Sequence, residues 1–488
     1  MKLSELLSGV RVLKVNADMD MEIPAVVYDS RKVTNGSLFV AVAGFATDGN
    51  RYIPMALEKG AAVIVTAQPQ TDTIPYVQVE SDRLALAQIG ANYFGHPGSS
   101  MKLIGITGTN GKTSSTLLLK HILEQVLHAK VGLMGTMENL IGDTVIPTER
   151  TTPESFELQA LLAQMRDAGC EYAIMEVSSH AIALERVAGL QYAVSAFTNL
   201  TEDHLDFHKT MESYCDTKAE LLCRCKSAVV NADDDWFERI TKRCACPMLT
   251  TSVKGKGSLY AENPTLLSDG VSFTAVYGDE RVTVNLPIPG KFTVYNALTA
   301  LGCAIRLGIS LTDAGKALAT AKGVKGRVEV VPTPGKDYTV LIDYAHTPDG
   351  LENVLTSVKG YCKGRLIAVF GCGGDRDPVK RPIMGRIGVE IADYAIITSD
   401  NPRTEDPGKI IQDILKGVDP AKNNYAVIEN RPKAIQHAMD IAGKDDIIVL
   451  AGKGHETYQE ICGVKHHLDE REVVAGYRNE MRNGSWEE

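Results

Sequence analysis

The chain has 488 residues, of which 44% are hydrophobic and 23% charged, proportions typical of soluble globular proteins. This length predicts about three domains, and the composition excludes collagen-like, coiled-coil and largely disordered chains. Acidic residues outnumber basic ones 61 to 51, giving a net charge of −10, so non-specific binding to nucleic acid is not expected.

The chain begins with MKLSELLSGV, which has neither a basic segment nor an apolar stretch of the secretory type. No run approaches the roughly 18 apolar residues that a membrane-spanning helix needs. We therefore expect no membrane insertion and a cytoplasmic location.

The ten cysteines are spread along the chain, and free thiols are the expected state in a chain without an export signal. One grouping stands out, Cys223-x-Cys225 followed by Cys244-x-Cys246. Zinc sites usually separate paired cysteines by two to four residues, so we favour ordinary thiols over a metal site.

Residues 1–98 alternate short apolar runs (26–27, 38–42 and 61–65) with turn signals, and a linker-like stretch follows at 96–100. The next region, 99–328, mixes expected strands at 103–106, 172–175 and 193–197 with helical patterns at 114–127 and 296–307. Together these patterns predict an α/β protein.

From residue 329 to 488 the pattern becomes regular, with expected strands at 338–342, 366–370, 394–398, 425–428 and 446–450 separated by stretches long enough for helices. This spacing is typical of a parallel α/β sheet. Polar clusters follow four of these strands, at 343–346, 373–376, 400–403 and 452–456. Because ligands of such sheets bind beyond the carboxyl ends of the strands, these clusters predict a binding site.

The strongest motif is residues 103–113, LIGITGTNGKT, which reads as a strand, a glycine-rich turn and the start of a helix. Backbone N–H groups of such a loop bind phosphates, while Lys112 would reach the β- and γ-phosphates and the Thr113 hydroxyl would ligate Mg²⁺. The common pattern has a glycine where this chain has Ile106, so the loop is a variant.

Four further residues lie in segments that could take part in phosphate chemistry. Glu176 follows the strand at 172–175 and could bind Mg²⁺, and His204 and His208 are spaced to share a helix face. Lys218 lies in an amphipathic stretch, and the residues alone predict an exposed helix lysine.

These motifs together resemble the ATP-dependent Mur ligases of peptidoglycan synthesis. The resemblance rests on 108–113, Glu176 with 178–180, 199–204, Lys218, 290–296, 326–329, 343–349 and 371–377, and on Asp29-Ser-Arg31. It implies three domains: an N-terminal uridine-binding α/β domain (1–98), a central P-loop ATPase domain with a parallel sheet (99–328) and a C-terminal Rossmann-like domain (329–488).

The resemblance also implies a reaction. ATP phosphorylates the free glutamyl carboxylate of a UDP-N-acetylmuramoyl dipeptide, and the amine of an incoming amino acid attacks the acyl phosphate. The implied catalytic residues are Lys112, Glu176, His204 and Lys218, with Lys218 carbamylated by CO₂, and the implied Mg²⁺ ligands are Thr113, Glu176, His204 and carbamylated Lys218. The implied ATP-binding residues are Gly108, Thr109, Asn110, Gly111, Lys112, Thr113, Ser114, Asn296, Arg327 and Asp343.

For the UDP-sugar, the resemblance implies contacts from Tyr28, Ser30, Phe45, Ala46, Thr47, Arg150, Thr151, Thr152, Ser178, Leu184 and Arg186. Two of these depart from the family pattern. Leu184 stands where relatives carry Gln, and Arg150 stands where they often carry Asn.

The motif Asp400-Asn-Pro-Arg403 bears on which amino acid is added. meso-Diaminopimelate has one carboxylate more than lysine, and a guanidinium can bind that group through two parallel hydrogen bonds. The resemblance implies that Asp400, Asn401, Pro402, Arg403, Arg376, Gly452 and Glu456 bind diaminopimelate, with Glu456 beside its ammonium group.

Several alternatives stay open. The chain could be a sister ligase that adds lysine or another diamino acid, or a folate-polyglutamate ligase. Arg403 argues against lysine, and the motif at 29–31 argues against folate. A non-catalytic nucleotide-binding relative would have lost Lys112, Glu176, His204 or Lys218, and a GTPase would carry an Asn-Lys-x-Asp motif, which we do not find. We expect a monomer that binds small molecules.

Overall fold

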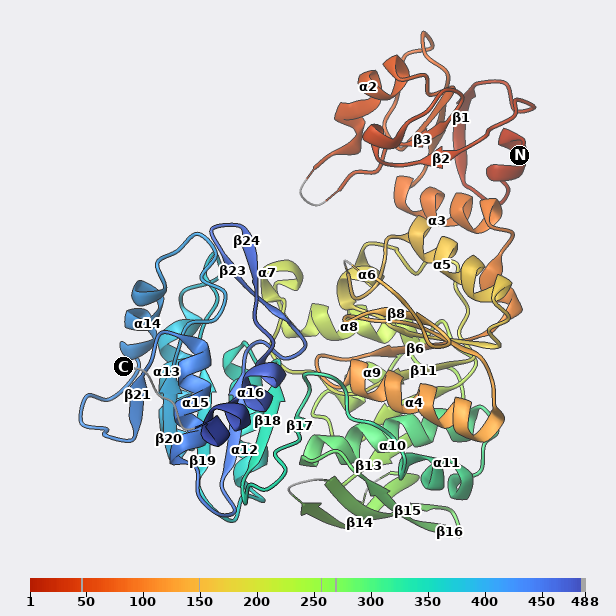
Figure 1. Cartoon of the computed structure of the whole chain (residues 1–488). Helices are drawn as coiled ribbons and strands as arrows, with labels where there is room; N and C mark the ends of the chain where they lie inside the picture. Colours follow the sequence, from red (N-terminus) through yellow and green to blue (C-terminus); the bar gives the residue numbers. More distant parts are fainter. Residues whose placement is uncertain (45–46, 149, 256, 268–269, 484–488) are drawn as a thin grey trace. The chain divides into compact units, whose positions relative to one another are not determined.

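The computed structural model of the chain describes residues 1–44, 47–148, 150–255, 257–267 and 270–483 (Figure 1). It divides into two compact units, one comprising 1–260 with 298–314, the other 261–297 with 315–488. Its three main sheets are largely parallel and alternate with helices along the chain, which confirms the expected α/β class. The expected domain boundaries at 98 and 328 stay predictions, although the strands of each main sheet lie within one expected domain.

The first sheet has the strand order β1-β5-β4-β3-β2, and only β1 runs antiparallel to its neighbour. Its strands are β1 (Val12–Asn16), β2 (Val26–Val27), β3 (Leu38–Val40), β4 (Val63–Thr66) and β5 (Tyr76–Val79). The accompanying helices are α1 (Leu3–Leu6), α2 (Ile53–Glu58) and α3 (Asp82–Tyr93). Buried Leu, Val and Ile side chains from the strands, α1 and α3 form one core here.

The second sheet has the order β16-β15-β14-β13-β12-β11-β6-β10-β7-β8-β9. Its strands are β6 (Lys102–Thr107), β7 (Val131–Met134), β8 (Asn139–Ile141), β9 (Thr144–Ile146), β10 (Tyr172–Glu176), β11 (Val194–Phe197), β12 (Ala228–Asn231), β13 (Met248–Ser252), β14 (Leu259–Leu267), β15 (Gly270–Tyr277) and β16 (Glu280–Leu286). The associated helices are α4 (Lys112–Leu127), α5 (Ser155–Asp167), α6 (Ser179–Ala183), α7 (Leu205–His208), α8 (Met211–Leu222), α9 (Phe237–Thr241), α10 (Lys291–Arg306) and α11 (Leu311–Leu318).

The central strands β6, β10 and β11 are parallel neighbours, so their carboxyl ends meet at one edge of the second sheet. Helix α4 begins two residues before the expected start because Gly111, with φ +84°, is its N-cap. Helix α10 begins five residues before its expected start at 296.

The third sheet has the order β17-β18-β22-β19-β20-β21, in which only β17 is antiparallel. Its strands are β17 (Glu329–Val331), β18 (Thr339–Asp343), β19 (Leu366–Phe370), β20 (Tyr394–Ile397), β21 (Tyr425–Val427) and β22 (Ile447–Ala451), and a hairpin of β23 (Tyr458–Ile461) and β24 (Val464–His467) follows. Helices here are α12 (Pro348–Lys359), α13 (Lys380–Ile391), α14 (Pro407–Leu415), α15 (Arg431–Ile441) and α16 (Glu470–Asn483).

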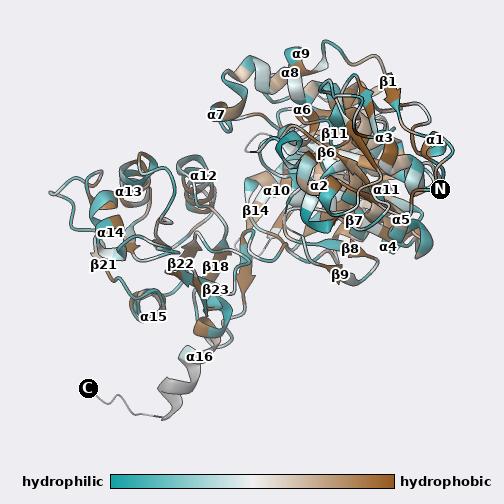
Figure 2. Ribbon diagram, turned by 90° about the horizontal axis from the view of Figure 1, so that it is seen from above, coloured by the Kyte–Doolittle hydropathy of each residue, from teal (hydrophilic) through white to brown (hydrophobic). Residues whose placement is uncertain are grey.

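Alternate residues of the third sheet point to opposite faces, as the pleat requires. Leu341, Ala368 and Val449 pack with α12, α13 and α14, whereas neighbouring strand residues pack with α15 and α16. Figure 2 shows the hydrophobic strands β18 and β22 between α12 and α15. None of the helices in the described residues is long and apolar enough to cross a membrane.

Candidate active site

The loop 108–111 connects β6 to α4, as the motif predicts. Gly108 has φ +148°, and a Cβ there would lie 1.9 Å from the Thr198 hydroxyl oxygen, so the loop requires glycine at this position. The Lys112 ammonium donates to the carbonyl oxygens of Gly108 and Thr109, both at 2.9 Å. The loop therefore combines a helix N-terminus with a cation, the arrangement that binds phosphate groups.

The segment after β11 supports this loop. Thr198 donates its hydroxyl to the Asn110 carbonyl at 2.6 Å, and the Asn110 N–H donates to Asn199 Oδ1 at 2.9 Å. The Thr109 N–H donates to the Asn199 carbonyl at 2.8 Å. The sequence singles out His204 and His208 of this segment, but the role of Thr198 and Asn199 in holding the loop depends on these long-range contacts.

Glu176 is the last residue of β10 and is fully buried, so it is not a solvated loop glutamate. Its carboxylate accepts hydrogen bonds from the Thr113 hydroxyl at 3.0 Å and from the Thr136 N–H and hydroxyl at 3.0 and 2.8 Å. The prediction pairing Glu176 with Thr113 agrees with this geometry. Thr136 carries no local signal and was missed.

A hydroxyl and a carboxylate in contact fit the oxygen preference of Mg²⁺, which usually takes one or two protein ligands beside phosphates and water. No cluster of three or more His, Cys, Asp or Glu able to hold a metal occurs among the described residues. A magnesium ion bound here would take substrate oxygens and water among its ligands.

Lys218 lies on α8 and is 1% exposed, so the expectation of an exposed helix lysine is wrong. Its ammonium nitrogen lies 3.0 Å from the Gly108 carbonyl oxygen and 4.6 Å from the centre of the Tyr214 ring. Burial, together with the nearby charge of Lys112, holds the Lys218 pKa well below its usual range. The Lys218 ammonium is thus easier to deprotonate than that of an exposed lysine.

Three histidines gather beside α8. The His180 ring centre lies 4.8 Å from that of His204 and 5.7 Å from that of His208. His204 is the N-cap of α7 with φ +55°, so it precedes the helix on which the i, i+4 spacing was expected to place it. His208 is buried against the Ser179 hydroxyl at 2.9 Å, and burial, with His180 nearby, lowers its pKa to about 4.

The candidate residues Thr152, Ser178 and Arg186 come together at the end of β10. The Thr152 hydroxyl donates to the Glu176 carbonyl at 2.8 Å and accepts from the Ser178 N–H at 3.1 Å. Arg186 donates to the Thr152 carbonyl at 3.3 Å. Thr151 accepts a 3.1 Å hydrogen bond from the Thr136 hydroxyl.

A cluster of three arginines surrounds Glu154. Arg186, Arg83 and Arg150 lie 3.3, 3.8 and 3.9 Å from the same Glu154 oxygen. Burial lowers the Arg186 pKa, and the charges of Arg150 and Arg83 add to that effect. Arg83, which sequence reasoning missed, also donates to the carbonyls of Leu184 and Ala43 at 3.3 and 3.1 Å. One carboxylate for three cations favours an anionic ligand.

Three further candidates for UDP-sugar binding, Tyr28, Ser30 and Thr47, belong to the same unit. Tyr28 donates its hydroxyl to Glu157 at 2.6 Å, and burial raises its pKa. The buried Ser30 contacts the Met55 sulfur at 3.6 Å, and Thr47 is exposed. Phe45 and Ala46 lie outside the described residues.

The second unit carries the expected amino-acid site. Arg403 has φ +51°, its Nη1 donates to the Gly374 carbonyl at 2.7 Å, and its Nε lies 3.3 Å from Glu460. The side chain is 21% exposed, so it is a partly buried guanidinium rather than a surface arginine. Arg376 is exposed and bonds only to the neighbouring Asp375 carbonyl in the contacts described.

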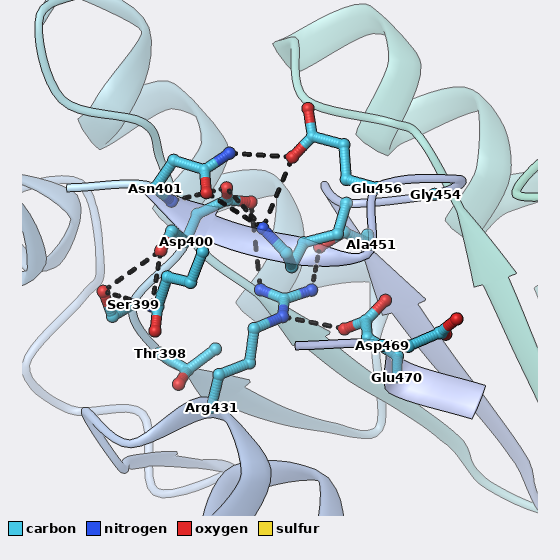
Figure 3. Close-up of polar contacts among 12 residues, drawn as sticks. Thr398, Ser399, Asp400, Asn401, Arg431, Ala451, Gly454, Glu456, Asp469 and Glu470 are labelled. Atoms are coloured by element: carbon cyan, nitrogen blue, oxygen red, sulfur yellow. Dashed lines mark hydrogen bonds and ion pairs between the residues drawn. The ribbon is translucent and has the colours of Figure 1, made fainter. Parts of the chain in front are cut away.

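Asn401 follows strand β20 and Glu456 follows strand β22 of the third sheet. Asn401 donates to Glu456 at 2.8 Å (Figure 3). Asp400 is buried, and Pro402 follows Asn401 in the buried part of the turn. Gly452 has φ +119°, and a Cβ there would lie 2.4 Å from an Asp400 carboxylate oxygen. The structure thus brings Asp400, Asn401, Gly452 and Glu456 together, as predicted.

The other nucleotide candidates also belong to the second unit. Asp343 accepts hydrogen bonds from the Val328 and Ala345 N–H groups, both at 2.8 Å, and burial raises its pKa. Arg327 stacks over the Tyr344 ring at 5.0 Å. Asn296 is 5% exposed on α10.

The cysteine grouping is a packed set of thiols. The Cys246 sulfur lies 3.5 Å from the sulfurs of both Cys225 and Cys244. Burial raises the pKa of Cys225, Cys244 and Cys246, which disfavours the thiolates that bind metals. All three thiols are free.

Comparison with known proteins adds a family and close relatives. Three family models match: "Mur ligase family, catalytic domain" over residues 22–93, "Mur ligase middle domain" over 106–304 and "Mur ligase, glutamate ligase domain" over 326–454. The UDP-N-acetylmuramoyl-L-alanyl-D-glutamate–2,6-diaminopimelate ligase of Clostridium tetani is 47% identical over 97% of this chain and 98% of its own length.

Among solved structures, one titled as a UDP-N-acetylmuramoyl-L-alanyl-D-glutamate–2,6-diaminopimelate ligase is 30% identical, has a TM-score of 0.74 and covers 99% of both chains. The MurF ligase of Thermotoga maritima in complex with ADP is 20% identical, with a TM-score of 0.62 over 94% of this chain and 98% of its own. At that identity the second likeness concerns the fold alone.

Proposed function

This chain belongs to the Mur ligase family, and we propose that it joins meso-2,6-diaminopimelate to UDP-N-acetylmuramoyl-L-alanyl-D-glutamate with conversion of ATP to ADP and phosphate. The product is a precursor of peptidoglycan. The observation that carries this assignment is 47% identity, over nearly the whole of both chains, to a ligase named for these two substrates. The partly buried Arg403, two residues after the Asn401 that contacts Glu456, supports diaminopimelate as the amine.

ATP binds at the loop 108–114 in this proposal. The N–H groups of the loop and of the first turn of α4 hold the phosphates, and Lys112 exchanges its carbonyl partners for phosphate oxygens. Phosphoryl transfer depends mainly on such positioning and charge neutralisation. Asn296, Arg327 and Asp343 contact the remainder of the nucleotide.

Thr113 and Glu176 hold Mg²⁺, with His204 and carbamylated Lys218 as further ligands. When bound, the ion neutralises charge on the transferred phosphoryl group. The 3.0 Å contact between Thr113 and Glu176 supports this assignment, because both side chains present oxygen to one point. Thr136 holds the Glu176 carboxylate in that orientation.

Lys218 is carbamylated in the active protein. Its neutral amine nitrogen attacks the carbon of CO₂, a C–N bond forms as one C=O π bond becomes C–O⁻, and the nitrogen releases one proton to water. A buried neutral amine thus becomes an anionic carbamate. The lowered pKa of Lys218 supports this step because only the unprotonated amine is a nucleophile.

The UDP-sugar is bound by Tyr28, Ser30, Phe45, Ala46, Thr47, Arg150, Thr151, Thr152, Ser178, Leu184 and Arg186, with Arg83 added by its contacts. The excess positive charge around Glu154 supports binding of the diphosphate. The acyl phosphate forms on the glutamyl carboxylate of this substrate. The diaminopimelate amine then attacks its carbonyl carbon, and phosphate leaves.

Diaminopimelate is bound by Arg376, Asp400, Asn401, Pro402, Arg403, Gly452 and Glu456. Arg403 binds the distal carboxylate and Glu456 the ammonium beside it. We further propose that the chain acts in the cytoplasm as a monomer with domains at 1–98, 99–328 and 329–488, and that it binds no nucleic acid.

Phosphate release from ATP tests the function directly. The assay supplies UDP-N-acetylmuramoyl-L-alanyl-D-glutamate and compares meso-diaminopimelate with L-lysine as the amine. Turnover with diaminopimelate alone supports the assignment. Turnover with lysine would keep the ligase but contradict the role of Arg403, and ATP binding without turnover with either amine would contradict the ligase itself.

A further inference from the structure

Behind the Asn401–Glu456 contact lies a buried group of charges whose two cations have no part in the roles above. It consists of Lys453, Arg431, Asp400, Glu470 and the inner oxygen of Glu456. Lys453 and Arg431 are 0 and 1% exposed. Burying two cations is costly unless anions and hydrogen bonds compensate, so their retention calls for a reason.

Lys453 contacts Glu456 directly and also through Asn401. Its ammonium lies 3.4 Å from Glu456 Oε2 and donates to Asn401 Oδ1 at 3.0 Å. The Glu460 N–H donates to the same Asn401 oxygen at 2.9 Å, so the amide nitrogen of Asn401 is turned toward Glu456 Oε2. Figure 3 shows the other Glu456 oxygen pointing away from this cluster. One oxygen is therefore held while the other is presented outward.

The second buried cation, Arg431, holds the carboxyl end of strand β22. Arg431 lies 2.7 Å from Glu470 and donates to the Ala451 carbonyl at 2.8 Å, next to Gly452. Figure 3 shows its guanidinium between Asp400 and Glu470, and it lies 3.9 Å from the Asp400 carboxylate. Lys453 also lies 3.9 Å from Asp400.

The formal charges do not cancel. Lys453 and Arg431 face three carboxylates, those of Asp400, Glu456 and Glu470. One negative charge is left over at the rim, where Glu456 is 14% exposed. This excess suits a ligand that brings an ammonium group to Glu456.

We propose that Lys453 is a positioning residue for the amine substrate: it holds Asn401 and one oxygen of Glu456 so that the other oxygen receives the substrate ammonium. Lys453 does not itself touch the substrate, because its side chain is fully buried and its ammonium faces Asn401, Asp400 and Glu456. The inference rests on the proposed function, since it assumes that an amino acid binds here.

The test measures initial rates of phosphate release while meso-diaminopimelate is varied, with ATP and the UDP-sugar dipeptide saturating. Lys453→Met, which keeps the side-chain length and removes the charge, should raise KM for diaminopimelate at least tenfold. KM for ATP should change less than twofold. Lys433→Met, at an exposed lysine of the adjacent helix α15, is the matched control and should behave like the parent.

A double variant separates positioning from a general loss of structure. If Lys453 acts through Glu456, Lys453→Met combined with Glu456→Gln should bind diaminopimelate no worse than Glu456→Gln alone. Independent, additive losses would overturn the proposal. So would an unchanged KM for diaminopimelate in a Lys453→Met protein with a parent-like thermal unfolding transition.

If Lys453→Met does not fold, Lys453→Gln provides the same comparison. Its side-chain amide can still donate to Asn401 but carries no charge. It should raise KM for diaminopimelate by a smaller factor, and an unchanged KM overturns the proposal. A parent protein without diaminopimelate-dependent phosphate release would instead overturn the proposed function, and this inference with it.

Discussion

The side-chain nitrogen of Lys218 lies 3.0 Å from the carbonyl oxygen of Gly108, the same oxygen to which Lys112 donates at 2.9 Å. Two ammonium groups on one carbonyl repel each other, and only Lys112 is partly accessible to solvent. Burial and the charge of Lys112 therefore lower the pKa of Lys218, the buried one of the two lysines. This contact places a buried lysine amine against the loop that precedes α4.

The first prediction is that activity depends on CO₂ through Lys218. Parent protein held in CO₂-depleted buffer should lose most of its phosphate release, and bicarbonate should restore it. Lys218→Ala should lose about two orders of magnitude in kcat, typical for removal of a charge-positioning group, and bicarbonate should not restore it.

Lys242→Ala, at an exposed lysine after α9, controls for the loss of a lysine in the same region and should keep the bicarbonate response. Parent activity that is insensitive to CO₂ depletion would argue against carbamylation. Full activity in Lys218→Ala would remove the residue from the mechanism.

Local patterns in the sequence predicted the parts of the site that local chemistry creates. Gly108 and Lys112 could be assigned because a strand, a tight turn and a helix N-terminus are encoded within a dozen residues. Glu176 and Asp400 could be singled out because each lies at the carboxyl end of a buried strand. In parallel sheets such ends meet at one edge, where ligands bind, and the two residues mark that edge in two different sheets.

The supporting residues could not be predicted in this way. Thr136, Arg83 and Lys453 acquire their roles from contacts with residues 40, 101 and 52 positions away. The burial of Lys218 likewise depends on the packing of α8 against β6 and β11 rather than on its own helix pattern. Such tertiary burial overrides the propensity of an isolated segment.

The pKa of His208 predicts acid sensitivity. In the unfolded chain a histidine titrates near 6.5, whereas burial lowers the folded pKa of His208 to about 4. Between these values the unfolded chain binds a proton that the folded chain does not, so the free energy of unfolding should fall as pH drops from about 6.5 to about 4. Above about pH 6.5 His208 should contribute no pH dependence.

Urea unfolding at pH 4 to 8 checks this expectation. His208→Gln can retain the hydrogen bond to Ser179 and should show a shallower fall in unfolding free energy over the acid range. His466→Gln, at an exposed position on β24, should retain the parent slope. Parallel curves for the parent and His208→Gln would contradict the assignment.

Gly108→Ala should weaken ATP binding. The new methyl group would lie 1.9 Å from the Thr198 hydroxyl that holds Asn110, so the loop must shift out of its phosphate-binding shape. Gly169→Ala is a matched control, because Gly169 also has a positive φ (+80°) but no atom within 4 Å of the added Cβ.

Titration calorimetry with ATP should give at least a tenfold weaker Kd for Gly108→Ala, and a parent-like Kd for Gly169→Ala despite a stability cost of about 1–2 kcal/mol. Equal ATP affinities in the two variants would show that the contact with Thr198 does not set the loop shape.

Arg403→Ala should remove the preference for diaminopimelate over lysine. The guanidinium is anchored by the Gly374 carbonyl and Glu460, so its position is set before a ligand arrives, and a preorganised charge discriminates strongly between substrates with and without a matching carboxylate. We expect kcat/KM for diaminopimelate to fall by an amount equivalent to about 2–5 kcal/mol, while Kd for ATP stays unchanged. Arg386→Ala, at an exposed arginine of α13, should leave both values as in the parent.

Glu460 would lose its partner in Arg403→Ala, so the double variant Arg403→Ala/Glu460→Gln separates the loss of stability from the loss of substrate binding. It should recover any lost stability but none of the lost kcat/KM. Recovery of diaminopimelate use in the double variant would mean that Arg403 serves only to neutralise Glu460 and does not bind the substrate carboxylate.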